Sequence, residues 1–217
     1  MKRIAFGIAA AAISIGLLAA IGALFGHRDL LSILIGGSIG SPFALEGTLL
    51  KSIPLLLTGL AVVIAFRAGV WNIGGEGQFI AGALAAFVAS PYGIAAALIA
   101  SLLAGAFWAS IASLLRIWRN APEVLTTILL NFVAIHLLGW CVNGPLQEPS
   151  RMYPQTDAAA VALPLLGASD LHAGIVLALL AGFASWWLIY RTKEGLRLRA
   201  TGYNANAART AGVNVNA

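Results

Sequence analysis

The sequence predicts an all-α membrane protein, a polytopic bundle of about six spanning helices with a cytoplasmic N-terminus. Three observations support this fold class. Hydrophobic residues make up 60% of the 217 residues, charged residues make up only 10%, and long apolar runs follow one another along the chain. An ordinary soluble domain is about one quarter charged, and its core has no use for so much apolar surface. The chain is therefore expected to cross a membrane repeatedly.

The apolar runs differ in length, and a full crossing needs about 20 apolar residues. The first run is longer than the apolar part of a signal peptide, which has about 7–15 residues, so it is predicted to be a retained span. The second and third are too short alone, and each must borrow residues from the polar stretch between them or be partly buried. The runs are residues 4–25, 53–66, 79–89, 92–115, 124–142 and 172–190.

Basic residues predict the orientation, because cytoplasmic loops of membrane proteins carry an excess of lysine and arginine. Successive crossings place every strong basic cluster on the side of the N-terminus. Residues 143–171 contain four prolines and are predicted to form an external loop. Residues 32–51 are predicted to be an outside loop followed by a short surface helix. The basic clusters are Lys2 with Arg3, Arg116 with Arg119, and Arg191 with Lys193, Arg197 and Arg199.

Residues 67–78, between the second and third runs, combine polar side chains with four glycines. In lipid, ionisable groups and unpaired backbone are costly unless they face the bundle interior or a wet cavity. Transporters build midplane sites from helices broken in this way. An ordinary loop at the membrane surface, with Arg67 as a cytoplasmic flank, is an equally good interpretation of the spacing. The polar side chains are Arg67, Asn72, Glu76 and Gln78.

The fifth run carries Glu123, Thr127 and Asn131 four positions apart, and so on one helix face. Asn131 lies well inside the run, where a hydrogen bond between helices is favoured over direct contact with a solute. Asn120 is predicted to be the N-cap of this helix, ahead of Pro122 in the first turn.

Small residues recur every four positions in the third and fourth runs. Such stripes let helix backbones approach closely, so they predict packing and carry no information on function. The stripes are Gly77, Ala81, Ala85 and Ala89 in the third run, and Ala97, Ser101, Gly105, Ala109 and Ser113 in the fourth.

After residue 190 the chain becomes polar. Residues 191–217, the C-terminal segment, are predicted to lie in the cytoplasm as a loop or solvated tail. Alanines favour a short helix near 204–211, and Gly212 is predicted to stop it.

Several kinds of chemistry have no motif in this sequence. There is no G-x-x-x-x-G-K-[ST] loop, so the chain is not expected to hydrolyse ATP. There is no H-E-x-x-H motif, and Cys141 is the single cysteine, so neither a metal site nor a cofactor is expected. No catalytic residue is predicted. The alternative from another class is an intramembrane enzyme that uses Glu76 or Glu123 as acid or base.

Several stretches together resemble a known family. PLLLTGL (54–60), FRAGVWNIGGEGQFIAGALAA (66–86) and EVLTTILLN (123–131) are similar to the signature of bacterial ABC-transporter permeases. The resemblance is to the branched-chain amino acid/simple-sugar superfamily, and most closely to its nucleoside/simple-sugar type. Residues 195–213 also match that group, and the resemblance runs from about Gly47 onward.

The resemblance implies a permease subunit of an ATP-driven importer in the bacterial plasma (inner) membrane. The cargo would be nucleosides or simple sugars, with branched-chain amino acids or other small polar solutes as the alternative. The implied partners are ABC ATPase subunits, a second permease subunit of the same or a related kind, an extracellular or periplasmic solute-binding protein, and membrane lipid. Nucleic acid is not an expected partner.

The resemblance also implies roles for segments. Residues 1–190 would be the N-terminal part of the permease domain, with Arg67, Asn72, Glu76, Gln78 and Asn131 lining or supporting the translocation path. Permeases of this group are longer, so the chain is expected to be a fragment or a truncated product, and a non-transporting remnant is a further alternative. Residues 191–217 would couple to the ATPase through Gly195, Arg199, Gly202, Asn204, Ala207, Ala208, Arg209 and Gly212.

Overall fold

The computed structural model describes residues 2–26, 29–167 and 169–215, and within those ranges the regular elements are helices. This confirms the predicted all-α fold class. The chain divides into two compact units. The smaller holds the residues up to 52 together with 166–171, and the larger holds residues 53–165 and the residues from 172 onward. Each is described by itself.

The smaller unit contains α1 (Lys2–Leu24), α2 (Leu30–Ile39) and the first part of α3 (Pro42–Arg67). The Ser41 hydroxyl accepts a hydrogen bond from the Ala44 N–H at 3.1 Å, which caps the start of α3. Thr48 donates its hydroxyl to the Ser38 carbonyl at 2.8 Å and so connects α3 to the end of α2.

The prediction of an outside loop within residues 32–51 is wrong, because α2 and α3 occupy nearly all of this stretch. Pro42 stands at the first position of α3, where a missing N–H removes no helical hydrogen bond. The predicted surface helix continues without interruption through Pro54 to Arg67. The second apolar run therefore gains its length from the residues before it, not from the polar stretch after it.

Among the residues that the structure describes, four helices are long and apolar enough to cross a membrane: α3, α5 (Ile94–Arg119), α6 (Glu123–Asn143) and α7 (Gly174–Arg191). The helix α4 (Gly75–Ala89) has 15 residues. At 1.5 Å per residue it spans about 22 Å, which is less than the hydrocarbon core of a bilayer.

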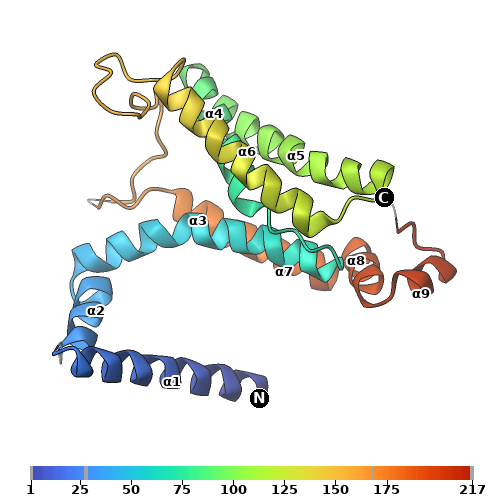
Figure 1. The fold of residues 1–217 in the computed structure, drawn as a ribbon, viewed down its shortest axis with the longest axis horizontal. Helices are drawn as coiled ribbons and strands as arrows, with labels where there is room; N and C mark the ends of the chain where they lie inside the picture. The colour runs from blue at the N-terminus through green and yellow to red at the C-terminus, as the bar shows by residue number, and fades with distance from the viewer. Residues whose placement is uncertain (1, 27–28, 168, 216–217) are drawn as a thin grey trace. The chain divides into compact units, whose positions relative to one another are not determined.

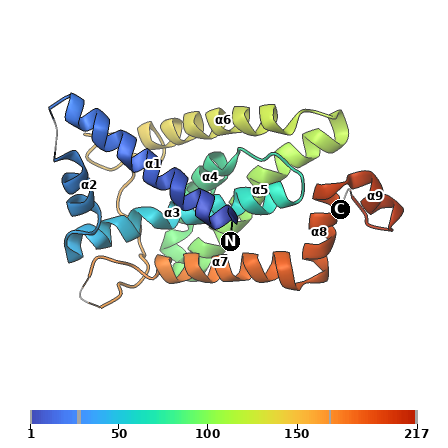
Figure 2. The ribbon, with the colours of Figure 1, turned by 90° about the horizontal axis from the view of Figure 1, so that it is seen from below.

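In the larger unit, α4, α5 and α6 lie side by side (Figures 1 and 2). A Cβ added to Gly82 of α4 would stand 3.1 Å from the Ser101 carbonyl oxygen, and one on Gly105 would stand 3.4 Å from that of Gln78. The small stripe of α5 is therefore confirmed as a packing face at Ser101 and Gly105. Its partner Gly82 lies one position beyond the predicted stripe of α4.

Short turns join these helices. A 3-10 turn, η1 (Ser90–Tyr92), leads from α4 into α5. Asn120 adopts a left-handed conformation, with φ of 52°, and closes α5 as its C-cap. The prediction that Asn120 caps the next helix is wrong, because Pro122 takes the N-cap position of α6. Arg116 and Glu123 form an ion pair across this turn.

Between α6 and α7, residues 144–167 and 169–173 form an irregular segment. Inside it, Leu165 and His172 form an isolated antiparallel bridge. After α7, Thr192 leads directly into α8 (Lys193–Tyr203), and α9 (Ala205–Thr210) follows. The predicted short helix near residues 204–211 is confirmed.

Candidate functional site

The polar stretch of the sequence forms a break between two helices. Residues 68–74, called the helix break below, separate the end of α3 from the start of α4. Gly74, at the end of the break, is buried, and so are Gly75 and Gly77 in the first turn of α4. The Asn72 side-chain oxygen accepts a hydrogen bond from the Gly74 N–H at 2.8 Å. This local hydrogen bond stabilises the turn that leads the backbone into α4.

Two side chains of α6 hold the helix break in place. Asn131 donates its amide nitrogen to the Ile73 carbonyl at 2.9 Å, and its oxygen accepts from the Gly77 N–H at 2.9 Å. The buried Thr127 hydroxyl accepts from the Ile73 N–H at 3.2 Å. Three backbone groups that the interrupted helix leaves open are thereby satisfied. The predicted hydrogen bond from Asn131 to another part of the helix bundle is confirmed.

Close packing at this point leaves no space for side chains on two glycines. A Cβ on Gly77 would lie 2.9 Å from both the Asn131 side-chain oxygen and the Trp108 indole nitrogen. A Cβ on Gly74 would lie 3.0 Å from the Asn72 side-chain oxygen. The Trp108 N–H is buried and has no hydrogen-bond partner within the described chain. The glycines therefore allow α6 and α5 to approach the break.

The remaining polar candidates of this stretch occupy different places. Gln78 is half-buried beside the break, whereas Glu76 is exposed in the first turn of α4. Within the described ranges Glu76 makes no ion pair and no side-chain hydrogen bond. A carboxylate in the first helical turn complements the positive end of the helix dipole. The structure thus gathers Asn72, Gln78 and Asn131 at the break, with Glu76 turned to the surface.

Arg67 stands at the last position of α3 and meets residues from the other end of the chain. Its guanidinium carbon lies 5.7 Å from the centre of the Tyr190 ring, and that of Arg199 lies 5.4 Å from the same ring centre. Arg67 therefore belongs to a basic cluster with α7 and α8, and lies apart from the Asn131 contacts.

The helix α8 packs on the beginning of the helix break through glycine. A Cβ on Gly202 would collide with the Arg67 carbonyl oxygen and would lie 3.0 Å from the Gly69 nitrogen. Gly69 has φ of +76°, and its own Cβ would lie 3.0 Å from the Gly202 Cα. Two backbones thus touch directly, and this contact is called the glycine joint below.

Glycine also allows the sharp corner between α7 and α8. The Thr192 hydroxyl caps α8 by accepting from the Gly195 N–H at 3.0 Å. A methyl group on Gly195 would collide with the carbonyls of Leu188 and Ile189. The corner therefore fixes the direction in which α8 leaves α7.

The other residues expected to couple to an ATPase form α9 and its caps. The Asn204 side chain accepts from the N–H groups of Asn206 and Ala207, at 3.0 and 3.1 Å. Ala208 is 4% exposed, Arg209 is exposed, and Gly212 ends the helix with φ of +83°. This stretch therefore contains the predicted short helix, and most of its residues are exposed.

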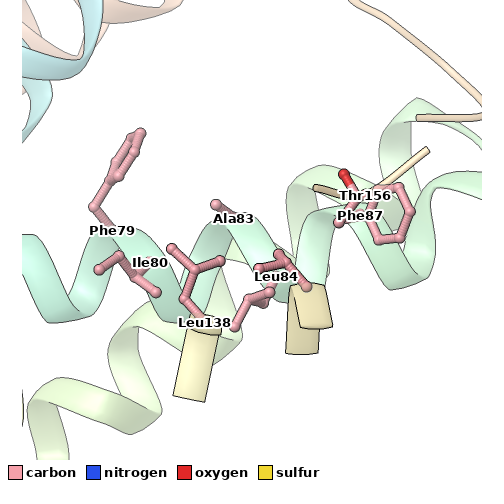
Figure 3. A pocket seen from close by; sticks show the side chains of 8 residues that line it. Phe79, Ile80, Ala83, Leu84, Phe87, Leu138 and Thr156 are labelled. Carbon is pink, nitrogen blue, oxygen red and sulfur yellow. The ribbon is translucent and has the colours of Figure 1, made fainter. Parts of the chain in front are cut away.

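A hollow lies between α4 and α6, and Thr156 of the irregular segment also lines it (Figure 3). Most of its lining is apolar, so it offers a polar solute few partners. The lining side chains labelled in Figure 3 are Phe79, Ile80, Ala83, Leu84, Phe87, Leu138 and Thr156.

The site residues predicted from the sequence did not include Thr127, Tyr190 and Trp108, which also build these contacts. Thr127 was predicted to share a helix face with Asn131, but its contact with the helix break was not predicted. The contacts of Tyr190 and Trp108 have no signal in the sequence beyond aromatic character, because their partners are distant in the sequence.

Residues 44–217 match the family described as "Branched-chain amino acid transport system / permease component". The chain is 34% identical over 223 residues to the glucose ABC transporter permease protein TsgB13 of Haloferax volcanii, covering 94% of this chain and 59% of that protein. It is 33% identical over 196 residues to the guanosine ABC transporter permease protein NupP of Bacillus subtilis, covering 85% and 56%.

A nucleoside ABC transporter permease protein of Lactococcus lactis, NupB, is 26% identical over 209 residues, with 88% of this chain and 56% of that protein covered. The chain thus spans 56–59% of the length of these relatives. No solved structure matches it. Since the family match includes most of the chain, the protein belongs to the branched-chain amino acid transport system permease component family.

Proposed function

We propose that this chain is a translocation subunit of an ATP-driven importer for nucleosides or simple sugars. Family membership and the names of the relatives, which refer to glucose, guanosine and nucleosides, support this function. The chain is a multi-pass protein of the plasma membrane. Since its sequence has no phosphate-binding loop, ATP hydrolysis is assigned to a separate ATPase subunit, and solute delivery to an external binding protein.

The glycine joint is the observation that carries this proposal. It places α8, in the segment assigned to the ATPase, directly against the start of the helix break. The other end of the break is held on α6 by Asn131. A displacement of α8 would therefore be transmitted to the start of α4 through the irregular backbone of residues 68–74.

The chemistry of the chain suits this role. A broken helix beside polar side chains provides hydrogen-bonding groups that an intact apolar helix does not offer. Asn131 and Thr127 support the break, and Asn72, Glu76 and Gln78 are assigned to the path or its support. Arg209, exposed on α9, is assigned to the ATPase contact.

Uptake measurements test the cargo class. The full chain is reconstituted in vesicles with its ATPase, its permease partner and its binding protein, and supplied with labelled guanosine, glucose or leucine. We expect ATP-dependent accumulation of guanosine or glucose. Accumulation of leucine alone would place the chain in the same family but contradict the proposed cargo. Absence of uptake for all three, with the assembled complex verified by mass, would contradict transport of these solutes.

A further inference from the structure

We propose that the basic cluster at the ends of α3 and α7 is a binding site for a phosphate group, supplied by a lipid headgroup or by free phosphate. The site consists of Arg67 and Arg199, with Tyr190 between the helices that carry them. This inference concerns a ligand of the protein at rest and does not depend on the transported solute.

Arg67 and Arg199 both lie within 5.7 Å of one ring centre, that of Tyr190. Their guanidinium carbons are therefore separated by no more than the sum of the two distances, about 11 Å. The two residues are 132 positions apart in the sequence, so the fold itself brings these two cations together.

Arg67 and Arg199 have no counter-charge within the described chain. Within the described chain neither arginine lies within 4.0 Å of a carboxylate, and the two ion pairs found there involve Arg116 and Arg197. Arg199 donates its Nε to the Gly195 carbonyl at 3.4 Å, which leaves its terminal nitrogens for another acceptor. The face of Tyr190 attracts cations but carries no net charge, so the cluster keeps its positive charge.

The two arginines also border a space that can hold a ligand. Arg67 and Arg199 line a hollow of about 150 Å³, together with Phe66, Gly202 and Tyr203. At about 30 Å³ per water molecule, this volume takes a phosphate group with some of its water. Guanidinium groups bind phosphate oxygens through paired hydrogen bonds. The lining therefore has the charge, the donors and the room for this anion.

The position favours a lipid as the source. Both α3 and α7 are long enough to span a membrane, and they end at Arg67 and Arg191. Trp71 and Trp186 are exposed near the same helix ends, as aromatic residues are at membrane interfaces. Phospholipid phosphates lie at this depth. Basic pockets between spanning helices are known to bind lipid headgroups.

Binding here would have a mechanical consequence. Arg67 and Gly202 are at once part of the hollow and part of the glycine joint. A phosphate held by Arg67 of α3 and Arg199 of α8 would bridge the two helices at the point where they touch, and so hold α8 in place.

Ligand binding to the purified full chain tests the site without transport. The chain is titrated in neutral detergent with phosphatidylglycerol, with phosphatidylcholine and with inorganic phosphate, and bound ligand is counted by native mass spectrometry. The double variant Arg67→Gln/Arg199→Gln is compared with Arg191→Gln. Arg191 is a matched control, because it lies 5.6 Å from the centre of the Trp186 ring at the same helix end but does not line the hollow.

We expect the double variant to bind phosphatidylglycerol roughly 25-fold more weakly, about fivefold for each arginine, and the Arg191 variant to change less than twofold. Competition by inorganic phosphate would identify free phosphate as the ligand, and its failure would identify the lipid headgroup. The charge-conserving variant Arg67→Lys/Arg199→Lys should lose less affinity, which separates lost charge from lost folding. Equal weakening in the double variant and in the control, or no binding by the wild type, would overturn the proposal.

Discussion

At the scale of single residues, Asn131 shows how one amide can replace two backbone partners. Its nitrogen and oxygen bind a carbonyl and an N–H on opposite sides of Gly74. Both contacts agree on the orientation of the amide, because the nitrogen meets the acceptor Ile73 and the oxygen meets the donor Gly77. The spacing of Thr127 and Asn131 predicted their shared face. Their partner, the helix break 54 to 58 positions earlier, could not be predicted, since spacing within one helix does not identify the surface it faces.

Replacing Asn131 with leucine should destabilise the protein by about 1–3 kcal/mol, because two backbone groups lose their partner and each such bond in a membrane protein is worth roughly 0.6–1.7 kcal/mol. Denaturant unfolding of the detergent-solubilised chain measures the change. The control is Asn143→Leu, since Asn143 donates only to the Gly139 carbonyl of its own helix and is exposed. Equal destabilisation by both changes would mean that Asn131 does not hold the break.

At the scale of elements, the sequence predicted the apolar helices better than it predicted their ends. The Gly36–Gly37 pair was predicted to lie in a loop but lies within α2, whereas the helix predicted to start near Pro42 does begin there and is longer than predicted. Asn120 was assigned to the wrong helix because asparagine suits both an N-cap and a left-handed C-cap. Local chemistry permitted both structures in each case, and contacts with distant residues decide between them.

The irregular segment between α6 and α7 contains one element whose stability should depend on pH. Hydrogen bonds from Ser150 and then Gln155 hold the pKa of Glu148 below its ordinary value of 4.5. A lowered pKa means that ionised Glu148 stabilises the turn at pH values above about 4.5, and that this contribution is lost as the pH falls through the lowered value.

Hydrogen exchange should show this loss directly. The Tyr153 N–H, which donates to the Glu148 carboxylate at 3.3 Å, should be protected at neutral pH and lose protection as the pH falls below the ordinary pKa of 4.5 and through the lowered pKa of Glu148, after correction for the intrinsic exchange rate. The variant Glu148→Gln should show little pH dependence. Protection that is unchanged at pH 3 in the wild type would show that the carboxylate does not order this turn.

At the scale of the whole molecule, the parts assigned to cargo and to the ATPase belong to one compact unit. The glycine joint links residues 69 and 202, which no sequence pattern could have paired, although the two stretches were each recognised by their resemblance to the family. The family predicts which segments matter. The structure adds that the segment assigned to coupling touches the helix break itself, and does so through backbone and not through flexible side chains.

The most direct test of this account is ATP-dependent uptake by the Gly202→Ala variant in the assembled importer. Overpacking at a close contact costs about 1–3 kcal/mol, so the methyl group should displace α8 from the Gly69 turn. The matched control is Gly139→Ala, because a Cβ at Gly139 of α6 would meet no atom within 4 Å. With equal protein in the membrane and the ATPase still bound, the account predicts that Gly202→Ala lowers uptake at least about tenfold while Gly139→Ala stays within about twofold. Uptake by Gly202→Ala at the level of the wild type would contradict it.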